Sequence, residues 1–127
     1  MKSMILGAAV TACALLISAP AFAEIYSPAG TWTTGHKDSR YEITLCGDGD
    51  DMCGTLVWSK DQSPEARRLL NTMVVDTARR VGNQEWYGVT NIAGNRFRGT
   101  LTLVDRDTLH IKACNGLFCG EFDLFRE

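Results

Sequence analysis

The chain has 127 residues, with 13 Lys and Arg against 15 Asp and Glu, and a formal net charge of −2. This length fits one domain. A mildly acidic chain with scattered basic residues lacks the concentrated basic face that nucleic acid requires, so we expect no nucleic-acid partner.

The first 23 residues have the pattern of a secretory signal peptide. Lys2 precedes an apolar run that closes on Ala21-Phe22-Ala23, a small-x-small cleavage sequence. We therefore expect cleavage after Ala23, a mature domain over residues 24–127, and a periplasmic or secreted location. Pro20 and the polar chain that follows it argue against a membrane span.

A second interpretation of the same segment remains open. The sequence "VTAC" at residues 10–13 has the shape of a lipobox, which would place a lipid on Cys13. The mature chain would then begin with an exposed apolar tail, which makes this interpretation less favourable than cleavage after Ala23.

The mature chain alternates apolar and polar residues in short segments, as half-buried strands do. Clusters of Gly, Asp and Asn separate these segments. We predict eight strands, near residues 31–34, 40–46, 53–59, 72–77, 85–91, 96–104, 108–114 and 119–126.

One segment differs from the rest. Ser63 can cap a helix, Pro64 suits its first position and Glu65 its first turn. We predict a single short helix over Pro64–Leu70.

The four cysteines of the mature chain predict two disulfides, because an even number in an exported chain indicates bridges. If Cys46 opposes Cys53 in a hairpin, then Ile43 faces Leu56 and Tyr41 faces Trp58. If Cys114 opposes Cys119, then Ile111 faces Phe122 and His110 faces Asp123. Apolar side chains meet on one face in both hairpins, so we predict the bridges Cys46–Cys53 and Cys114–Cys119, on the outer, polar face.

The cysteine spacings argue against a metal or redox site. They are C-x6-C and C-x4-C, which match neither a redox CxxC motif nor zinc pairs. The acidic turn "GDGDDM" does not match the calcium-binding EF-hand pattern. We therefore expect no metal and no cofactor.

Sequential strands with one short helix predict an all-β fold, a small up-and-down antiparallel β-barrel of about eight strands. A barrel of this size is wide enough for side chains or one small ligand. The predicted inward face also includes Leu103, Leu109 and Leu124. The residues that we expect to contact a ligand are Tyr41, Ile43, Leu56, Trp58, Phe97, Leu101, Ile111 and Phe122.

Three residues suggest how the barrel closes. Gly30 and Trp32 begin the first strand, and Arg126 ends the last. In a closed barrel these strands are neighbours, and a guanidinium can stack on an indole. This pattern resembles the Gly-x-Trp and terminal Arg of lipocalin-like barrels.

A longer set of motifs resembles a family of exported bacterial proteins, domain of unknown function 2147. The motifs are "GTW", "YEITLC", "DMCGTLVW", "SPEARR", "DTLHIKAC" and "FCGEFDLFR", and they span Ala29–Arg126. The resemblance implies a secreted or periplasmic lipocalin-like β-barrel with no agreed activity. The chain departs from the family pattern at the terminal "LFR", which usually has Trp, and in "NIAGNRF" and "RRLLNT", which lack the usual Pro.

The chemistry-bearing residues do not predict an enzyme. The cysteines are expected to be oxidised, and His36 lies in a turn. His110, Glu42 and Glu121 fall on the outer face, which leaves the Tyr41 hydroxyl as the one ionisable group expected inside. Catalysis usually requires a nucleophile beside a base or two facing carboxylates.

We therefore predict a monomeric carrier or sensor of a small apolar ligand, such as a lipid or acyl chain. A periplasmic protein-interaction or inhibitor module is the main alternative, acting through Leu117 and Phe118 at a hairpin tip. A hydrolase is a third, less favoured hypothesis.

Overall fold

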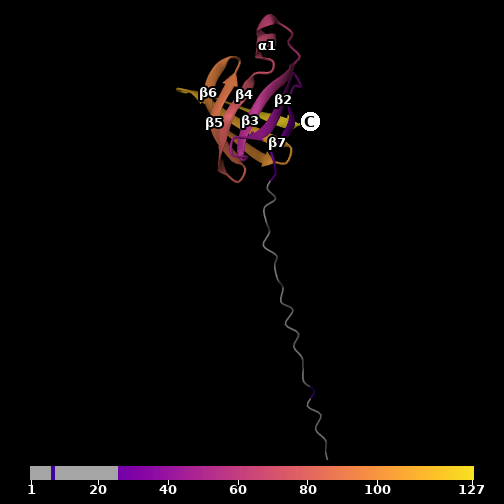
Figure 1. Ribbon diagram of the computed structural model, residues 1–127, viewed down its shortest axis with the longest axis vertical. Helices are drawn as coiled ribbons and strands as arrows, with labels where there is room; N and C mark the ends of the chain where they lie inside the picture. Colours follow the sequence, from indigo (N-terminus) through magenta and orange to yellow (C-terminus); the bar gives the residue numbers. More distant parts are fainter. Residues whose placement is uncertain (1–6, 8–25) are drawn as a thin grey trace, which may run out of the picture.

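Eight strands follow one another around a closed barrel in chain order, and each pairs antiparallel with the next (Figure 1). The computed structural model describes Gly7 and residues 26–127. The strands are β1 (Gly30–Thr34), β2 (Ser39–Cys46), β3 (Asp51–Ser59), β4 (Met73–Gly82), β5 (Glu85–Ile92), β6 (Asn95–Asp105), β7 (Thr108–Asn115) and β8 (Phe118–Arg126). The predicted eight-stranded up-and-down barrel is confirmed.

The up-and-down order places alternate connections at opposite ends of the barrel. The β1–β2, β3–β4, β5–β6 and β7–β8 connections lie at what we call the open end. The β2–β3, β4–β5 and β6–β7 turns lie at the closed end, together with the segment that leads into β1. Within the described residues 26–127 the barrel closes on itself, since β1 pairs with β8, and this segment also holds both disulfides.

Helix α1 (Pro64–Leu69) stands over the open end, in the connection between β3 and β4. The Ser63 side chain accepts a hydrogen bond from the Ala66 amide, with Pro64 at the start of the helix and Glu65 in its first turn. This capping explains why the helix begins where the sequence predicts it. It ends one residue earlier than predicted, because Leu70 is already extended.

The barrel interior is filled by alternate residues of the strands. The side chains with no exposed surface include Trp32, Met52, Leu101 and Leu109. They belong to one continuous core cluster with Trp86 at the closed end, where its indole donates a hydrogen bond to the Asp50 carbonyl. This half of the barrel is therefore solid.

The predicted pairing of β2 with β3 is wrong by two residues. Cys46 lies opposite Asp51, and Thr44 lies opposite Cys53. The β2–β3 turn is thus tighter than the sequence prediction supposed. Because the shift is an even number of residues, each side chain keeps its face.

Both predicted disulfides are present. Cys46 is bonded to Cys53 across diagonal positions, and Cys114 is bonded to Cys119 across directly paired positions. Both bridges lie on the outer face, since the neighbouring Met52 and Ala113 point into the core. Two disulfides indicate an oxidising compartment outside the cytoplasm.

Arg126 closes the barrel by lying over Trp32, with its guanidinium carbon 4.5 Å from the indole centroid. The two residues are register partners where β8 meets β1. A Cβ atom at Gly30 would stand 2.7 Å from the Arg126 guanidinium, so glycine leaves the space that this cation fills. Gly30, Trp32 and Arg126, which we expected to close the barrel, therefore lie side by side.

The expected signal peptide, residues 1–23, and the alternative lipid site at Cys13 lie outside the described residues. Within residues 26–127, no helix has the length and apolar character that crossing a bilayer requires.

Candidate functional site

An inner cavity of about 50 Å³ lies beneath the open end of the barrel. It is mostly apolar, and its walls come from five strands. The lining residues are Tyr41, Ile43, Val74, Val75, Thr90, Asn91, Ile92, Ile111, Phe122 and Leu124. A water molecule takes up about 30 Å³ in the liquid, so this cavity alone has room for little more than the end of an aliphatic chain.

An outer cleft of about 490 Å³ lies above the inner cavity, between α1 and the barrel. Ala66 and Leu69 of the helix form one wall, and Leu56 of β3 forms part of the floor. Ala66 and Leu69 are three residues apart, so they share one face of the helix. The cleft is thus built by a helix that contributes no buried residue to the core.

The two spaces form one site. They share Tyr41, Val74, Asn91 and Ile92, which stand where the cleft leads down into the cavity. The shared residues make a half-buried collar that is apolar apart from one phenol and one amide. We call the cavity and the cleft together the mouth pocket.

Tyr41 carries the one ionisable group among the residues that line the inner cavity. Burial raises its pKa above the ordinary value of 10.0, while a hydrogen bond with Ser39 partly offsets the effect. The phenol is therefore neutral at physiological pH and available as a hydrogen-bond donor at the collar.

Tyr41→Phe is expected to make the barrel less sensitive to alkali. Because the folded pKa is raised, the stabilisation linked to the neutral phenol is complete below pH 10.0 and lost as pH rises through the folded value. We expect the loss of unfolding free energy between about pH 8 and about pH 11 to be smaller in the variant than in wild type, measured by urea titration. Tyr87→Phe, at an exposed tyrosine, is the control and should keep the wild-type alkaline loss. Equal losses in Tyr41→Phe and wild type would contradict this assignment.

The predicted ligand residues divide between the mouth pocket and other places. Tyr41, Ile43, Ile111 and Phe122 line the inner cavity. Leu56 lines the outer cleft.

Three predicted ligand residues lie elsewhere, so their expected positions in a pocket are corrected. Leu101 is fully buried in the solid half of the core. Phe97 borders a groove beside the β7–β8 turn, because the start of β6 extends past its last register pair with β7, Arg98–Cys114.

Trp58 was expected to face inward, and the structure places it outside. Tyr41 pairs with Leu56 but Arg40 pairs with Trp58, so Val57 is an extra residue in β3. Such a bulge turns the following side chain to the other face of the sheet. Trp58 is 39% exposed and packs against the Arg40 guanidinium at 5.5 Å.

Sequence reasoning missed the contribution of β4, the end of β5 and α1. Val74, Val75, Thr90 and Ile92 line the inner cavity, and Ala66 and Leu69 the cleft. Alternation along β5 could have identified Thr90 and Ile92, since they continue the inward series of Trp86. Nothing in the sequence indicates that α1 lies over the mouth.

The acid and base groups of the described residues do not converge inside the barrel. His110 and Asp123 form the predicted outer pair, with His110 Nδ1 2.7 Å from a carboxylate oxygen of Asp123. Asp38, Asp61 and Glu65 line the outer cleft, beyond the collar. Among residues 26–127, no three or more His, Cys, Asp and Glu side chains are grouped so as to hold a metal ion.

A closed eight-stranded up-and-down barrel, with Arg126 over Trp32 at one end and the mouth pocket at the other, is a lipocalin-like fold. The solved structure of protein HP1028 from the human pathogen Helicobacter pylori, described as belonging to the lipocalin family, is similar. It superposes with a TM-score of 0.62 and 13% identity, over 80% of this chain and 84% of that chain. This likeness shows the fold.

The chain belongs to the family described as "uncharacterized protein conserved in bacteria" (DUF2147), whose sequence profile matches residues 30–126. This match confirms the resemblance seen in the sequence motifs. No curated protein matches the chain.

Proposed function

We propose that the protein binds a small apolar ligand in the mouth pocket. The observation that carries this proposal is the continuity of the cavity and the cleft through the collar of Tyr41, Val74 and Ile92. We further propose that it acts in the periplasm after cleavage at Ala23. The disulfides support an oxidising compartment of this kind.

The size of the mouth pocket limits the ligand. The outer cleft, at about 490 Å³, lies within the range of small-molecule sites, about 300–1,000 Å³. The inner cavity adds about 50 Å³. The ligand that fits has a narrow apolar end, which enters the cavity, and a broader part held under α1.

The polar groups of the cleft favour a ligand without a negative charge. Its charged lining residues are Asp38, Asp61 and Glu65, and no Lys or Arg lines it. A free fatty-acid carboxylate placed there would meet like charges without a counter-ion. An acyl ester, an alcohol or an amide fits the lining better, with the Tyr41 hydroxyl as one hydrogen-bond donor.

Binding, rather than catalysis, is the proposed activity. The inner cavity offers one phenol and no nucleophile beside a base. The three carboxylates of the cleft lie among solvent-exposed loop and helix residues. Two of them already accept hydrogen bonds, Asp38 from the Thr34 hydroxyl and Asp61 from the Ser63 amide.

Ala66→Trp is expected to weaken ligand binding by about tenfold or more, because the indole would occupy the outer cleft. The measurement is titration of the purified domain, residues 24–127, with an uncharged apolar fluorophore. Native mass spectrometry of the same preparation would identify any co-purified molecule that the fluorophore displaces.

Arg67→Trp is the matched control, because Arg67 is exposed and lies outside the cleft. It adds the same indole to the same helix and should leave affinity unchanged. Saturable binding that is equally strong in wild type, Ala66→Trp and Arg67→Trp would place the ligand elsewhere. Absence of binding in the wild type would overturn the proposed function.

A further inference from the structure

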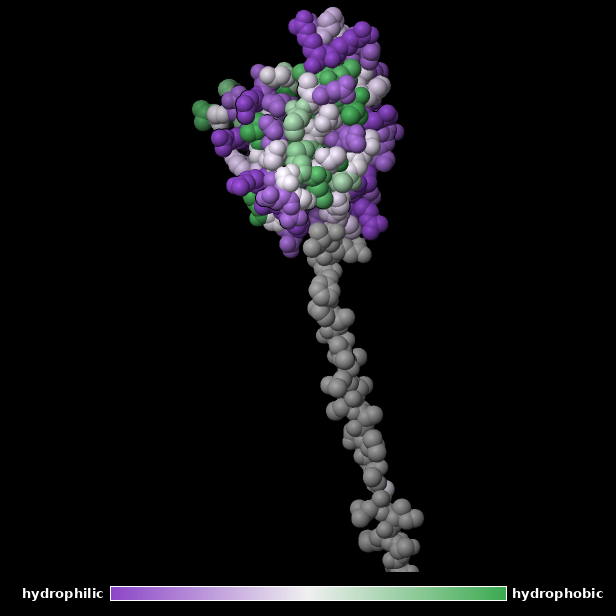
Figure 2. Space-filling model, in the orientation of Figure 1, coloured by the Kyte–Doolittle hydropathy of each residue, from purple (hydrophilic) through white to green (hydrophobic). Residues whose placement is uncertain are grey.

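The β7–β8 turn projects two apolar side chains into solvent at the open end. Gly116, with a φ of 62°, allows a two-residue turn between the paired residues Asn115 and Phe118. Leu117 is 99% exposed and Phe118 is 82% exposed. Figure 2 shows a hydrophobic projection at this edge of the barrel. We call Leu117 and Phe118 the hairpin tip.

The hairpin tip is held rigidly. Cys114 and Cys119 are bonded directly beneath the turn, and the β7–β8 pairing runs without a bulge from Thr108 to Asn115. A flexible loop could fold its apolar residues back onto the barrel. This short, cross-linked turn keeps Leu117 and Phe118 exposed together, where they are available to contact an apolar surface.

Cations lie beside the hairpin tip and around the open end. Arg96 and Arg98 line the groove that borders Asn115 and Gly116. The charged residues of the open-end connections are the cations Lys37, Lys60, Arg67 and Arg68, and the carboxylates Asp38, Asp61 and Glu65. Arg96 and Arg98 lie at the start of β6, and Asp76 of β4 lies level with Arg98 across β5. Six positive against four negative charges leave a net charge of +2.

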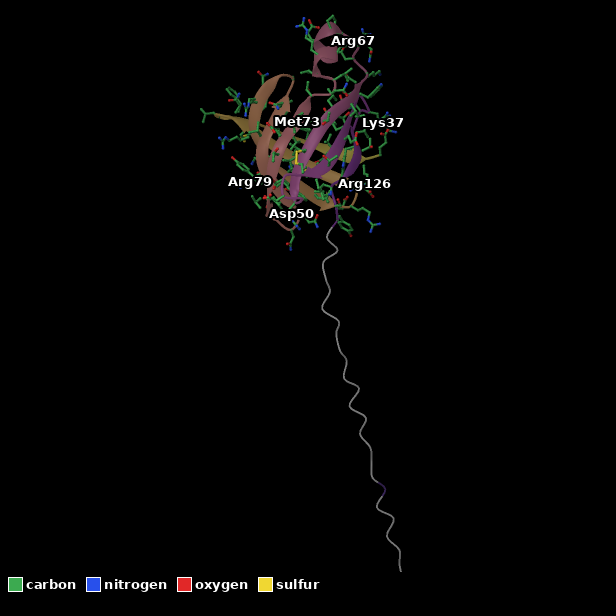
Figure 3. All side chains as sticks on the ribbon, viewed as in Figure 1. Lys37, Asp50, Arg67, Met73, Arg79 and Arg126 are labelled. Atoms are coloured by element: carbon green, nitrogen blue, oxygen red, sulfur yellow. A yellow bond between two sulfur atoms is a disulfide. The ribbon has the colours of Figure 1, made fainter. Side chains whose placement is uncertain are left out.

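These six cations make no ion pair with any residue of the described part of the chain. At the closed end Arg79 likewise makes no ion pair with a described residue, but two other arginines are engaged. Arg80 is paired with Asp50 and with two backbone carbonyls, and Arg126 holds the barrel closed. Figure 3 shows Arg67 and Lys37 toward the α1 end, and Asp50, Arg79 and Arg126 toward the other.

The closed end is rich in carboxylates. Its three turns and the adjoining strand ends carry six carboxylates and four arginines, a net charge of −2; these residues are Asp48, Asp50, Asp51, Glu85, Asp105 and Asp107, with Arg79, Arg80, Arg106 and Arg126. The barrel is therefore polarised along its axis although the whole chain has a net charge of only −2. An anionic surface would attract the open end and repel the closed end.

We propose that the open end docks on an anionic phospholipid surface, with Leu117 and Phe118 inserted among the lipid headgroups. The six cations would lie against the lipid phosphates, as basic groups do at a charged bilayer. A flat anionic surface fits this arrangement better than a protein pocket does, because the cations spread around the whole rim while the apolar group is a single narrow tip. Docking would turn the mouth pocket toward the lipid surface, from which a ligand could enter it. This role in ligand exchange rests on the proposed function. The docking itself can be tested separately.

The test is co-sedimentation of residues 24–127 with two kinds of vesicle, one of phosphatidylcholine alone and one with about 30% phosphatidylglycerol. We expect binding to the anionic vesicles, and a decrease of about tenfold between about 50 mM and about 500 mM salt. Leu117→Asp and Phe118→Asp should each weaken vesicle binding by about tenfold. The double variant Arg96→Gln, Arg98→Gln should weaken it by several-fold and flatten the salt dependence.

Matched controls come from the closed end. Val81 and Val104 are exposed there, so Val81→Asp and Val104→Asp make the same chemical change away from the tip, and Arg79→Gln removes an exposed cation. All three should bind vesicles like wild type. Leu117→Asp and Phe118→Asp should still bind the apolar fluorophore, which separates loss of docking from loss of the mouth pocket.

Three outcomes would overturn the docking proposal without touching the mouth pocket. One is no binding of wild type to anionic vesicles. Another is equal binding by the tip variants and the closed-end controls. The third is a dimer that depends on Leu117 and Phe118 in the absence of lipid, which would assign the tip to a second copy of the chain. If wild type does not bind anionic vesicles, the hairpin tip would instead be assigned to contact with a protein partner.

Discussion

Trp32→Ala is expected to lower the free energy of unfolding by about 3–5 kcal/mol. The side chain has no exposed surface and lies in the core beside the junction of β1 and β8. Its indole nitrogen donates a hydrogen bond to the Pro28 carbonyl at 2.9 Å. The substitution would leave a cavity, an unsatisfied carbonyl and an Arg126 without its stacking partner.

Trp58→Ala is the matched control for this prediction. The same atoms are removed, but from the outer face, where Trp58 is 39% exposed and contacts Arg40. The expected change is about 1 kcal/mol or less. Urea unfolding followed by far-ultraviolet circular dichroism measures both, and comparable losses would show that Trp32 has no special part in closing the barrel.

Arg126 explains why Trp32→Ala should lower stability by more than the loss of one buried side chain. Its guanidinium and Nε donate hydrogen bonds to the carbonyls of Ser27, Ala29 and Arg106. These acceptors lie before β1 and in the β6–β7 turn, so Arg126 ties its own strand, β8, to two other segments at the closed end. Lysine has one nitrogen at its tip and does not present donors in such a fork.

The strands were predictable because alternation along the chain reports which side chains share a face. The β7–β8 register was also predictable, since Lys112 faces Glu121 and Ile111 faces Phe122 across a two-residue turn without a bulge. The cysteine pair then falls on directly opposed positions. Local pattern and tertiary structure agree here because nothing interrupts the ladder.

The β2–β3 hairpin shows what alternation leaves undetermined. A register shift of two residues keeps apolar residues facing apolar residues, so the sequence pattern supports both registers equally. The Cys46–Cys53 bridge fits either, because diagonal partners 5.9 Å apart at Cα are still within bonding reach. The bulge at Val57, which moves Trp58 outside, has no signature in the sequence.

The sequence predicted which side chains of the candidate site face inward. It did not predict how deep in the barrel each of them lies. Tyr41 and Ile111 were expected inside and do line the cavity, but Leu101 on the same face lies deeper, in the filled half. The depth of a residue is its height along the barrel axis. The tilt and stagger of the strands in the closed sheet set this height. The α1 wall of the cleft depends in addition on how the β3–β4 connection folds over the open end.

Gly88→Ala is expected to lower the free energy of unfolding by about 2–4 kcal/mol. A Cβ atom at Gly88 would stand 2.6 Å from the Ala78 Cα and 3.0 Å from its Cβ. The closeness arises from an irregularity in β4, where the pairing with β5 is interrupted between Asp76 and Arg79 and Thr77 has a φ of 50°. The distorted segment lies over Gly88, and only a residue without a side chain leaves room for it.

Gly120→Ala is the matched control, because a Cβ atom there would meet no other atom within 4 Å. It should leave stability unchanged or raise it by about 0.4–1 kcal/mol through reduced freedom of the unfolded chain. Thermal and urea unfolding of the two variants measure the difference, and a Gly88→Ala variant as stable as Gly120→Ala would show that β4 can straighten.

A second substitution tests whether the clash is with backbone or side chain. Ala78→Gly would remove the Cβ at 3.0 Å but leave the Cα at 2.6 Å in place. The double variant Gly88→Ala, Ala78→Gly should therefore recover little of the stability that Gly88→Ala loses. It should also lose the packing of the fully buried Ala78 methyl group. Substantial recovery would instead mean that the two strands can separate slightly, and that Gly88 is required for side-chain packing rather than for the irregular path of β4.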